Sequence, residues 1–590
     1  MIVRMKKLTL LCTRASREAT LNALRDYGVV HLTPIQPPEG NDLEKAREDF
    51  SYIAGALNEL PPAARAKQTG TPAREAVDEI WKLIRRRETL EEQIETLRQK
   101  IRRYEPFGDF SPAAIQQLNA AGVTVKLVKL PVKNPPAFAD GVQIVELSRE
   151  KNTVYAALIY RGEIDFTGEE IPLPDAPLNE IKQLLSTTEK ELSEIEPAIE
   201  KFAGDRSAIK ELSADAENRI RYLEARDGMG SEKDILYLQG FFPVEKEDTI
   251  RATAGENGWA VLIETPSADD AVPTLLRNPK WMDPIKPVFK LIDVFPGYDE
   301  VDISGVFLIF LSIFYAFIVG DAGYGLLFIA ASLFAKFKFR ASRIAQMTTN
   351  LLILMSACTV VWGVINGAWF GISYDFLPAV LQNLTVPWLI AGGDGDLSRT
   401  RIMLICFTIG AIHLSIAHAW NIIRKYNSPD ALCNFGWLFT TWSFYFLALN
   451  LVLNIGKLSI FMLAALGIGV LLITIGIILN RNFSSLLTLV LDVVGNFTDI
   501  ISYVRLYAVG AASLAIAESF NAMGVDVNSA MPPVIGHLLG AIIIFAGHAL
   551  NVVLAALSVL VHGVRLNTLE FSNHAGVQWG GTAYKPFRKN

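Results

Sequence analysis

The feature that most constrains this chain is a pair of arginines inside its last two apolar stretches. Arg505 and Arg565 each lie in a segment long enough to cross a bilayer. An arginine at bilayer depth costs roughly 2.5–3.5 kcal/mol on insertion scales, and such a residue usually faces a water-filled or protein-lined path. A guanidinium group also keeps its proton inside a protein. Two fixed positive charges at this depth indicate ion handling rather than anchoring.

Charge divides the chain into two halves. Residues 1–300 hold 40 basic and 50 acidic side chains, whereas the rest of the chain holds 15 and 11. The chain is too long for a single domain, so we expect a cytoplasmic domain at 1–300 and a transmembrane ion-translocation domain at 301–590. The four scattered cysteines predict neither a disulfide framework nor a zinc site. Because no P-loop and no basic patch are present, we expect no nucleotide site, cofactor, metal or nucleic-acid partner.

The first half reads as two small α/β lobes. We predict one lobe, near the membrane, from 1–70 and 230–300, and a distal lobe from 107–177. Coiled-coil segments at 71–106 and 178–229 are expected to join them. The fold class is therefore an α+β cytoplasmic half followed by an all-α polytopic membrane domain.

Heptad spacing of apolar residues is the basis of the coiled-coil prediction. It runs over 76–104 and again over 178–224, which predicts two long helices that pair antiparallel and carry the distal lobe at their far end. Pro197 is expected to kink the second helix. The alternative is an ordinary helical bundle.

The second half contains seven apolar segments, at 303–338, 344–370, 402–423, 434–455, 458–480, 484–523 and 533–569. The motif Gly320-Asp-Ala-Gly-Tyr-Gly325 predicts a turn in the first segment and hence about eight crossings; the alternative is one tilted helix with Asp321 buried in it. With eight crossings, the basic loops and both termini fall on the cytoplasmic side of a multi-pass cell-membrane protein. Residues 371–400 and 524–532 are then expected outside.

The last two segments are too long for simple spans. Forty residues of helix measure about 60 Å at ~1.5 Å per residue, and the hydrocarbon layer is only ~30 Å thick. We expect these two helices to tilt, to project from the membrane, or to break.

Polar residues recur on these two segments at helical spacing. The first set is Asp492, Asn496, Asp499, Ser502 and Arg505, with Glu518 about four turns further on, and the second is His548, Asn551, Ser558, His562 and Arg565. Each set falls on one face of a helix, so the two helices can line a water-accessible path. The alternative is that these groups satisfy one another as interhelical hydrogen bonds. For His413 and His418 we expect that second role.

Several motifs resemble the large membrane stator subunit, called a or I, of V-type and A-type rotary ATPases. They are Gly320-Asp-Ala-Gly-Tyr-Gly325, Trp362-Gly-Val-Ile-Asn-Gly-Ala-Trp-Phe-Gly371, Gly410-Ala-Ile-His413, Ser502-Tyr-Val-Arg-Leu506, Gly547-His548, Val561-His-Gly-Val-Arg-Leu-Asn-Thr-Leu-Glu-Phe571 and Tyr584-Lys-Pro-Phe587. With the heptads they cover nearly all the chain. The absence of the large insertions of eukaryotic members suggests a bacterial or archaeal protein.

The resemblance implies a mechanism and a set of partners. A ring of small membrane subunits, each with a buried carboxylate, rotates past the last two helices and exchanges H⁺ or Na⁺ through two offset half-channels. Arg505 and Arg565 would stand between the half-channels, and peripheral stalks would connect the chain to the ATPase head. Many members carry a glutamate where this chain has Ala555, so that half-channel is expected to use His548, Asn551 and Glu570.

Two other functions fit the sequence less well. A stand-alone secondary transporter or channel does not need the heptads, and no inverted repeat is apparent. A purely structural anchor leaves the polar stripes unexplained.

Overall fold

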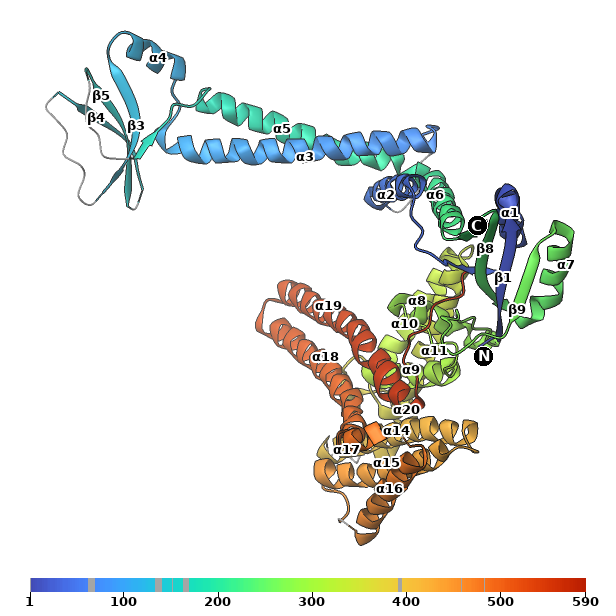
Figure 1. Cartoon of the computed structure of the whole chain (residues 1–590). Helices are drawn as coiled ribbons and strands as arrows, with labels where there is room; N and C mark the ends of the chain where they lie inside the picture. Colours follow the sequence, from blue (N-terminus) through green and yellow to red (C-terminus); the bar gives the residue numbers. More distant parts are fainter. Residues whose placement is uncertain are drawn as a thin grey trace. The chain divides into compact units, whose positions relative to one another are not determined.

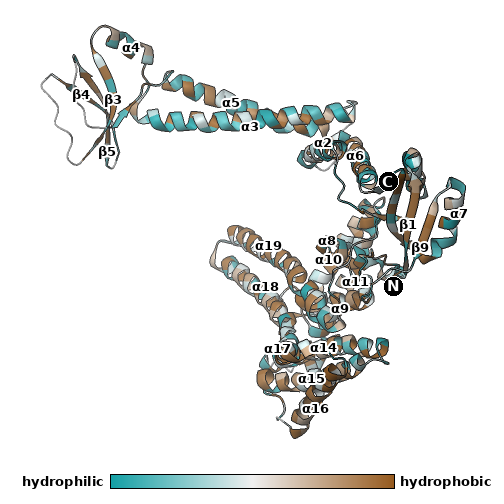
Figure 2. Ribbon diagram, viewed as in Figure 1, coloured by the Kyte–Doolittle hydropathy of each residue, from teal (hydrophilic) through white to brown (hydrophobic). Residues whose placement is uncertain are grey.

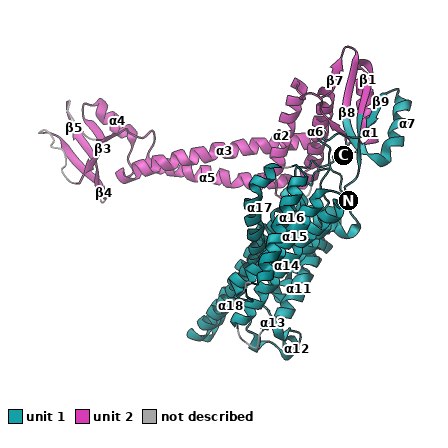
Figure 3. Cartoon of the chain, turned by 60° about the horizontal axis from the view of Figure 1, so that its bottom comes forward, with its two compact units in different colours: residues 1–8, 240–586 teal, residues 9–239, 587–590 magenta. Residues whose placement is uncertain are grey.

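The computed structural model describes residues 2–61, 69–132, 141–150, 152–162, 169–390, 395–457, 459–481 and 483–589. The chain forms two compact units, residues 1–8 with 240–586 and residues 9–239 with 587–590 (Figure 3). The division at residue 300, between a cytoplasmic and a transmembrane domain, is a separate matter from these two units and stays a prediction.

The first three hundred residues form a mixture of helices and strands. In chain order these are β1 (Met5–Thr13), α1 (Arg17–Tyr27), β2 (His31–Thr33), α2 (Asn41–Glu59), α3 (Ala73–Tyr104), α4 (Pro112–Ala120), β3 (Thr124–Pro131), β4 (Gln143–Glu150), β5 (Thr153–Tyr160), β6 (Glu169–Ile171), α5 (Leu178–Glu200), α6 (Arg206–Asp227), β7 (Gly230–Glu232), β8 (Ile235–Pro243), α7 (Glu247–Asn257), β9 (Ala260–Glu264) and α8 (Lys286–Ile292). One sheet has the order β2-β8-β1-β9, and the other, made of residues between α4 and α5, has the order β4-β5-β3-β6.

The helices α3 and α5 lie side by side (Figure 1). Heptad residues of α3 such as Ile80 and Leu90 pack in one core with Ile195 and Ile199 of α5. Ion pairs flank this seam, with Arg98 2.8 Å from Glu189 and Lys182 2.7 Å from Glu105. Glu105 directly follows α3 and pairs with Lys182, near the start of α5, whereas Arg98 pairs with the later Glu189, so the two helices run antiparallel. These exposed pairs orient the helices more than they stabilise them.

The sequence predicted one long second helix over 178–224, and this prediction was wrong. A 3₁₀ segment at Lys201–Asp205 separates α5 from α6. Pro197 removes a backbone donor near the end of α5, and Gly204 is a poor helix former, so the local chain does not sustain a continuous helix. The helix α2, which the sequence analysis did not predict, packs on α6 through Leu43 and Leu223.

The remainder of the chain is helical and largely apolar, as the brown ribbons of Figure 2 show. Its helices are α9 (Ser304–Val319), α10 (Ala322–Lys338), α11 (Arg343–Asn366), α12 (Ala379–Gln382), α13 (Pro387–Ile390), α14 (Gly395–Arg424), α15 (Pro429–Leu453), α16 (Ile460–Leu479), α17 (Phe483–Ser502), α18 (Val504–Ala530), α19 (Pro533–Ser558) and α20 (Ser572–Ala575). Among the described residues, 6 helical stretches are long and apolar enough to cross a membrane, and α9 is a shorter apolar helix.

The predicted turn in the first apolar segment is present. Gly320 ends α9 with a φ of 69°, and Asp321 begins α10 by accepting a hydrogen bond from the Tyr324 amide. The second oxygen of Asp321 accepts from the Gly371 amide at 3.3 Å. On α11, Gly363 approaches so closely that a Cβ there would lie 2.1 Å from the Ala322 nitrogen. The number of crossings remains a prediction.

The first of the two long C-terminal segments breaks, which was one of the three expected solutions, whereas the second stays helical from Pro533 to Ala575 and changes to π geometry on the way. Tyr503 separates α17 from α18, and α19 is followed by two π-helical segments, Val559–Gly563 and Leu566–Phe571. The helix α18 extends to Ala530, so most of the loop expected at 524–532 is helical. The helices α18 and α19 then lie side by side (Figure 1).

The Asp321 side chain offers a test of the break between α9 and α10. Since this 4 % exposed carboxylate accepts from two backbone amides, Asp321→Ala is expected to lower the free energy of unfolding by about 1–3 kcal/mol. Asp321→Asn should lower the free energy of unfolding less, because its amide oxygen can still accept a hydrogen bond from a backbone amide. Thermal unfolding in detergent measures both, with the exposed Asp526→Asn as control. Unfolding of Asp321→Ala at the wild-type temperature would contradict this role.

Candidate functional site

Both intramembrane arginines converge on one carboxylate. Arg505 Nη2 lies 3.0 Å from Glu570 Oε1, and Arg565 Nε lies 3.6 Å from the same oxygen. The Glu570 side chain is 5 % exposed, whereas the side chains of Arg505 and Arg565 are 25 % and 53 % exposed. We call these three residues the arginine–glutamate triad. Two positive charges against one negative leave the triad with a net charge of +1.

Helix geometry explains how the triad forms. Residues five apart in an α-helix point in different directions at 3.6 residues per turn, but in a π-helix residues i and i+5 are hydrogen-bonded neighbours. The π segment Leu566–Phe571 therefore brings Glu570 to the same side as Arg565. The break at Tyr503 places Arg505 in the first turn of α18. Tyr503 is anchored there, because its hydroxyl lies 2.8 Å from His413 Nδ1.

His413 is a packing residue, as expected. Its ring is stacked between Phe310 and Phe571, with centroid distances of 3.9 Å and 4.3 Å. This aromatic stack joins α9 and α14 to the π segment that holds Glu570. The core beneath the triad is thus fixed by ring packing as well as by charge.

The first cavity, which we call the Asp492 cavity, has a volume of about 680 Å³. Its polar lining is His418, Asn421, Lys425, Asp430, Asn434, Asp492, Asn496, Asp499, Asn573 and His574. Asp492 is exposed and accepts from the Thr488 hydroxyl at 2.9 Å. Asp499 lies 3.0 Å from His574 Nε2. A liquid water occupies about 30 Å³, so the cavity has room for many waters.

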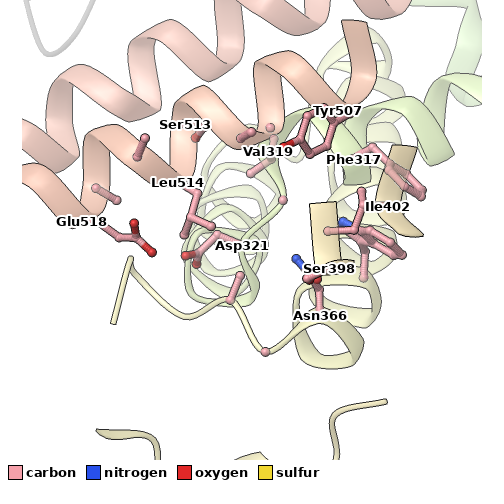
Figure 4. A pocket seen from close by; sticks show the side chains of 18 of the residues that line it. Phe317, Val319, Asp321, Asn366, Ser398, Ile402, Tyr507, Ser513, Leu514 and Glu518 are labelled. Carbon is pink, nitrogen blue, oxygen red and sulfur yellow. The ribbon is translucent and has the colours of Figure 1, made fainter. Parts of the chain in front are cut away.

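The second cavity, which we call the Glu518 cavity, has a volume of about 340 Å³. Figure 4 shows Glu518, Asp321 and Ser513 lining it from α18 and from the start of α10. Arg399 of α14 also lines it. On the α17–α18 path, the Asp492 cavity is lined by residues before Arg505 and the Glu518 cavity by residues after it.

His548 and Asn551 belong to a separate polar cluster next to the Glu518 cavity. Tyr324, which lines that cavity, lies with its hydroxyl 2.6 Å from His548 Nδ1 and 3.1 Å from Asn551 Nδ2. Asn551 also accepts from the Ser513 hydroxyl at 2.9 Å, and His548 Nε2 lies 3.1 Å from the oxygen of Asn521. The structure therefore does not group His548 and Asn551 with Glu570.

The other predicted residues have more local surroundings. Asn496 is buried and donates to Thr441 at 3.2 Å, which ties α17 to α15. The Ser502 hydroxyl donates to the Asp499 carbonyl at 2.7 Å. His562 is partly exposed in the first π segment.

Sequence reasoning missed His574, Tyr324 and Asn521. His574 Nδ1 lies 3.1 Å from His418 Nε2, which joins α20 to α14. Tyr324 stood within a quoted motif, but its partners are more than 200 positions away in the chain. A single polar residue near a terminus carries no periodic signal, so His574 could not have been found from spacing.

Comparison with known proteins gives relatives over the whole length. The chain is 30% identical over 634 residues to "V-type ATP synthase subunit I 1" of Treponema pallidum, and the match covers 100% of both chains. It is 28% identical to "V-type ATP synthase subunit I" of Borreliella burgdorferi, again over 100% of both. It is 26% identical to "A-type ATP synthase subunit I" of Methanocaldococcus jannaschii, over 71% of this chain and 64% of that protein. No family model matches.

A solved structure of the cytoplasmic N-terminal domain of subunit I, homolog of subunit a, of V-ATPase matches 44% of this chain and 99% of that domain. The sequence identity is 15% and the TM-score is 0.22. This score is too low for the match to bear on the fold.

Glu570 is expected to stabilise the site by neutralising Arg505. Glu570→Leu removes the carboxylate and leaves a largely buried guanidinium without it, so we expect a loss of about 1–3 kcal/mol in the free energy of unfolding. The stability of Glu570→Gln should lie between that of the wild type and that of Glu570→Leu, because its amide oxygen still accepts from Arg505. Thermal unfolding in detergent measures both, with the exposed Asp492→Asn as control. Equal stability of all four proteins would show that the triad is not held by Glu570.

Proposed function

This chain belongs to the family of subunit I of V-type and A-type ATP synthases, and from this premise we propose that the arginine–glutamate triad is its ion barrier. It is a membrane protein and a subunit of a rotary ATPase complex. In the proposal, a ring of small subunits rotates past α18 and α19. Each ring carboxylate exchanges H⁺ or Na⁺ through one cavity, passes the triad ionised, and reloads through the other.

The placement of the two cavities carries this proposal. They lie on either side of Arg505 along α17 and α18, and each is lined by at least one carboxylate. A continuous aqueous pore would dissipate a gradient worth about 2.3 kcal/mol per charge per 100 mV. Two separate cavities with fixed positive charges between them give ions access to the ring without a direct leak.

The charge of the triad suits a passing carboxylate. A cation near a carboxylate favours its ionised form, and at ~4 Å with an effective dielectric near 20 the attraction is about 4 kcal/mol per pair. Two free guanidinium groups would hold the ring more strongly than one. Because Glu570 neutralises one of the two charges, the triad can keep a passing ring carboxylate ionised, so that it releases its ion, without holding the ring in place.

The remaining parts of the chain are assigned by the same premise. We propose that α3 and α5 act as a lever and that the lobe between them, at 107–177, binds the peripheral stalks that connect to the ATPase head. The motivation is mechanical, because a stator must resist the torque of the rotor. Part of that lobe, and residues 391–394 of the expected outer loop, lie outside the described residues. We propose that both termini lie on the cytoplasmic side.

Removal of the fixed charge tests the proposal most directly. We expect Arg505→Ala to abolish ATP-driven ion transport in reconstituted vesicles while the complex stays assembled. Arg505→Lys should also transport poorly, because a desolvated lysine loses its proton readily. The matched control is Arg343→Ala, since Arg343 is an exposed arginine at the start of α11. Near-normal transport by Arg505→Ala would overturn the barrier.

Sidedness of the two cavities is a separate prediction. In a variant without the four native cysteines, Asp492→Cys is expected to react with a membrane-impermeant thiol reagent from the cytoplasmic side only. Glu518→Cys is expected to react from the opposite side only. The control is Tyr503→Cys, which should resist both because Tyr503 is 0 % exposed. Reaction of positions 492 and 518 from the same side would contradict offset half-channels and favour a simple channel.

A further inference from the structure

Four side chains form an unbroken hydrogen-bonded line beside the Asp492 cavity. Asn434 Oδ1 lies 3.2 Å from His418 Nδ1, and His418 Nε2 lies 3.1 Å from His574 Nδ1. His574 Nε2 then lies 3.0 Å from Asp499 Oδ2. The line crosses from α15 through α14 and α20 to α17. We call His418, His574 and Asp499 the histidine relay.

The direction of these hydrogen bonds follows from the Asn434 end of the line, where the side chain is bonded to a backbone carbonyl. The Asn434 amide nitrogen donates to the Asp430 carbonyl at 2.8 Å, so its oxygen faces His418 and must accept. His418 therefore carries its proton on Nδ1. Because His418 is 2 % exposed and burial disfavours a charged ring, its Nε2 is unprotonated and accepts from His574 Nδ1.

This order leaves one proton for the last contact. His574 donates through Nδ1, so its Nε2 faces a carboxylate oxygen at 3.0 Å. A neutral ring and an ionised carboxylate would place two lone pairs against each other. Either His574 is an imidazolium beside an ionised Asp499, or His574 is neutral and Asp499 is protonated. Both states hold one proton between the same two atoms.

The shared proton can exchange with water. The Asp499 side chain is 28% exposed and that of His574 is 11% exposed, and both line the Asp492 cavity. The other titratable groups on this cavity are Lys425 of α14, Asp430 and Cys433 of α15, and Asp492 of α17. Lys425 and Asp430 pair with each other at 2.7 Å, and Asp492 accepts from the Thr488 hydroxyl at 2.9 Å. His413 lies within electrostatic reach of His574 and is buried.

We propose that the histidine relay is a proton-holding station of the Asp492 cavity and that the ion this chain passes to the ring is H⁺. The inference rests on the proposed function, since it assigns the ion of a path already placed there. In the loading step, a hydronium ion in the cavity gives its proton to Asp499 and becomes water. That proton then moves to His574 Nε2, which leaves a carboxylate and an imidazolium; release is the reverse.

The same atoms do not suit Na⁺. Sodium sites in membrane proteins are built from carbonyl and other oxygen atoms, whereas this line presents ring nitrogens that are already hydrogen-bonded to each other. An imidazolium next to Asp499 would also repel a second cation. A direct imidazole-to-carboxylate contact moves a proton without the displacement of any heavy atom, which is the usual use of histidine as a proton shuttle.

The test uses the intact complex reconstituted in vesicles, with ATP-driven proton transport followed by a pH-sensitive dye and sodium transport by ²²Na⁺. Wild-type complex is expected to transport protons in sodium-free buffer. His574→Ala should slow proton transport about a hundredfold, the lower end of the range for loss of a general acid–base group. Added imidazole should raise the transport rate of His574→Ala several-fold, because the cavity of about 680 Å³ admits an imidazole molecule.

Controls separate this proposal from the proposed function. His537→Ala replaces an exposed histidine whose ring contacts the Pro533 carbonyl of its own helix, and it should transport normally and gain nothing from imidazole. Imidazole should also leave Arg505→Ala inactive. If His574→Ala does not assemble, His574→Gln and Asp499→Asn replace it, and each should slow proton transport.

Two results would overturn the relay and leave the barrier intact. One is ATP-driven ²²Na⁺ uptake by wild type without proton transport. The other is wild-type proton transport by assembled His574→Gln and Asp499→Asn. Transport by Arg505→Ala would instead overturn the barrier on which the relay rests.

Discussion

Compensation of two guanidinium charges within a membrane domain is the constraint on which the last hundred residues depend. A charge at that depth is tolerated only next to an opposite charge or to water. Here Glu570 contacts both Arg505 and Arg565 through one oxygen, and the geometry needed for this is not available to a regular α-helix. The π segment Leu566–Phe571 provides it.

The helical path is also interrupted after Gly320 and at Tyr503. Interrupted backbone at membrane depth must find hydrogen bonds within the protein. Asp321 satisfies the start of α10 and a neighbouring turn, and the Ala322 amide donates to the Ala368 carbonyl at 2.9 Å. At the second break Tyr503 is fully buried and bonded to His413. Gly320 and Asp321 at the first break line the Glu518 cavity.

The histidine relay and the triad share the C-terminal segment. Glu570 and His574 are four residues apart on it, so one short stretch carries both the carboxylate that pairs with the arginines and the imidazole proposed to hold a proton. His574 is fixed in place by Asn421, whose amide donates to its carbonyl at 2.9 Å. One segment at the end of the last long helix thus carries a residue of the triad and a residue that lines the Asp492 cavity.

Local residue chemistry determined much of this protein from the sequence alone. Three glycines and an aspartate within 320–325 predicted the turn in the first apolar segment, heptads predicted the paired stretches of α3 and α5, and the intramembrane arginines pointed to the candidate site. Long-range contacts decided the rest. The break at 201–205 and the helix α2 gave no clear periodic signal, and the partners of His574 stand 75 and 156 positions away in the chain. Periodicity reports which face a residue occupies on its own helix, whereas only tertiary packing decides which residue of another helix meets it.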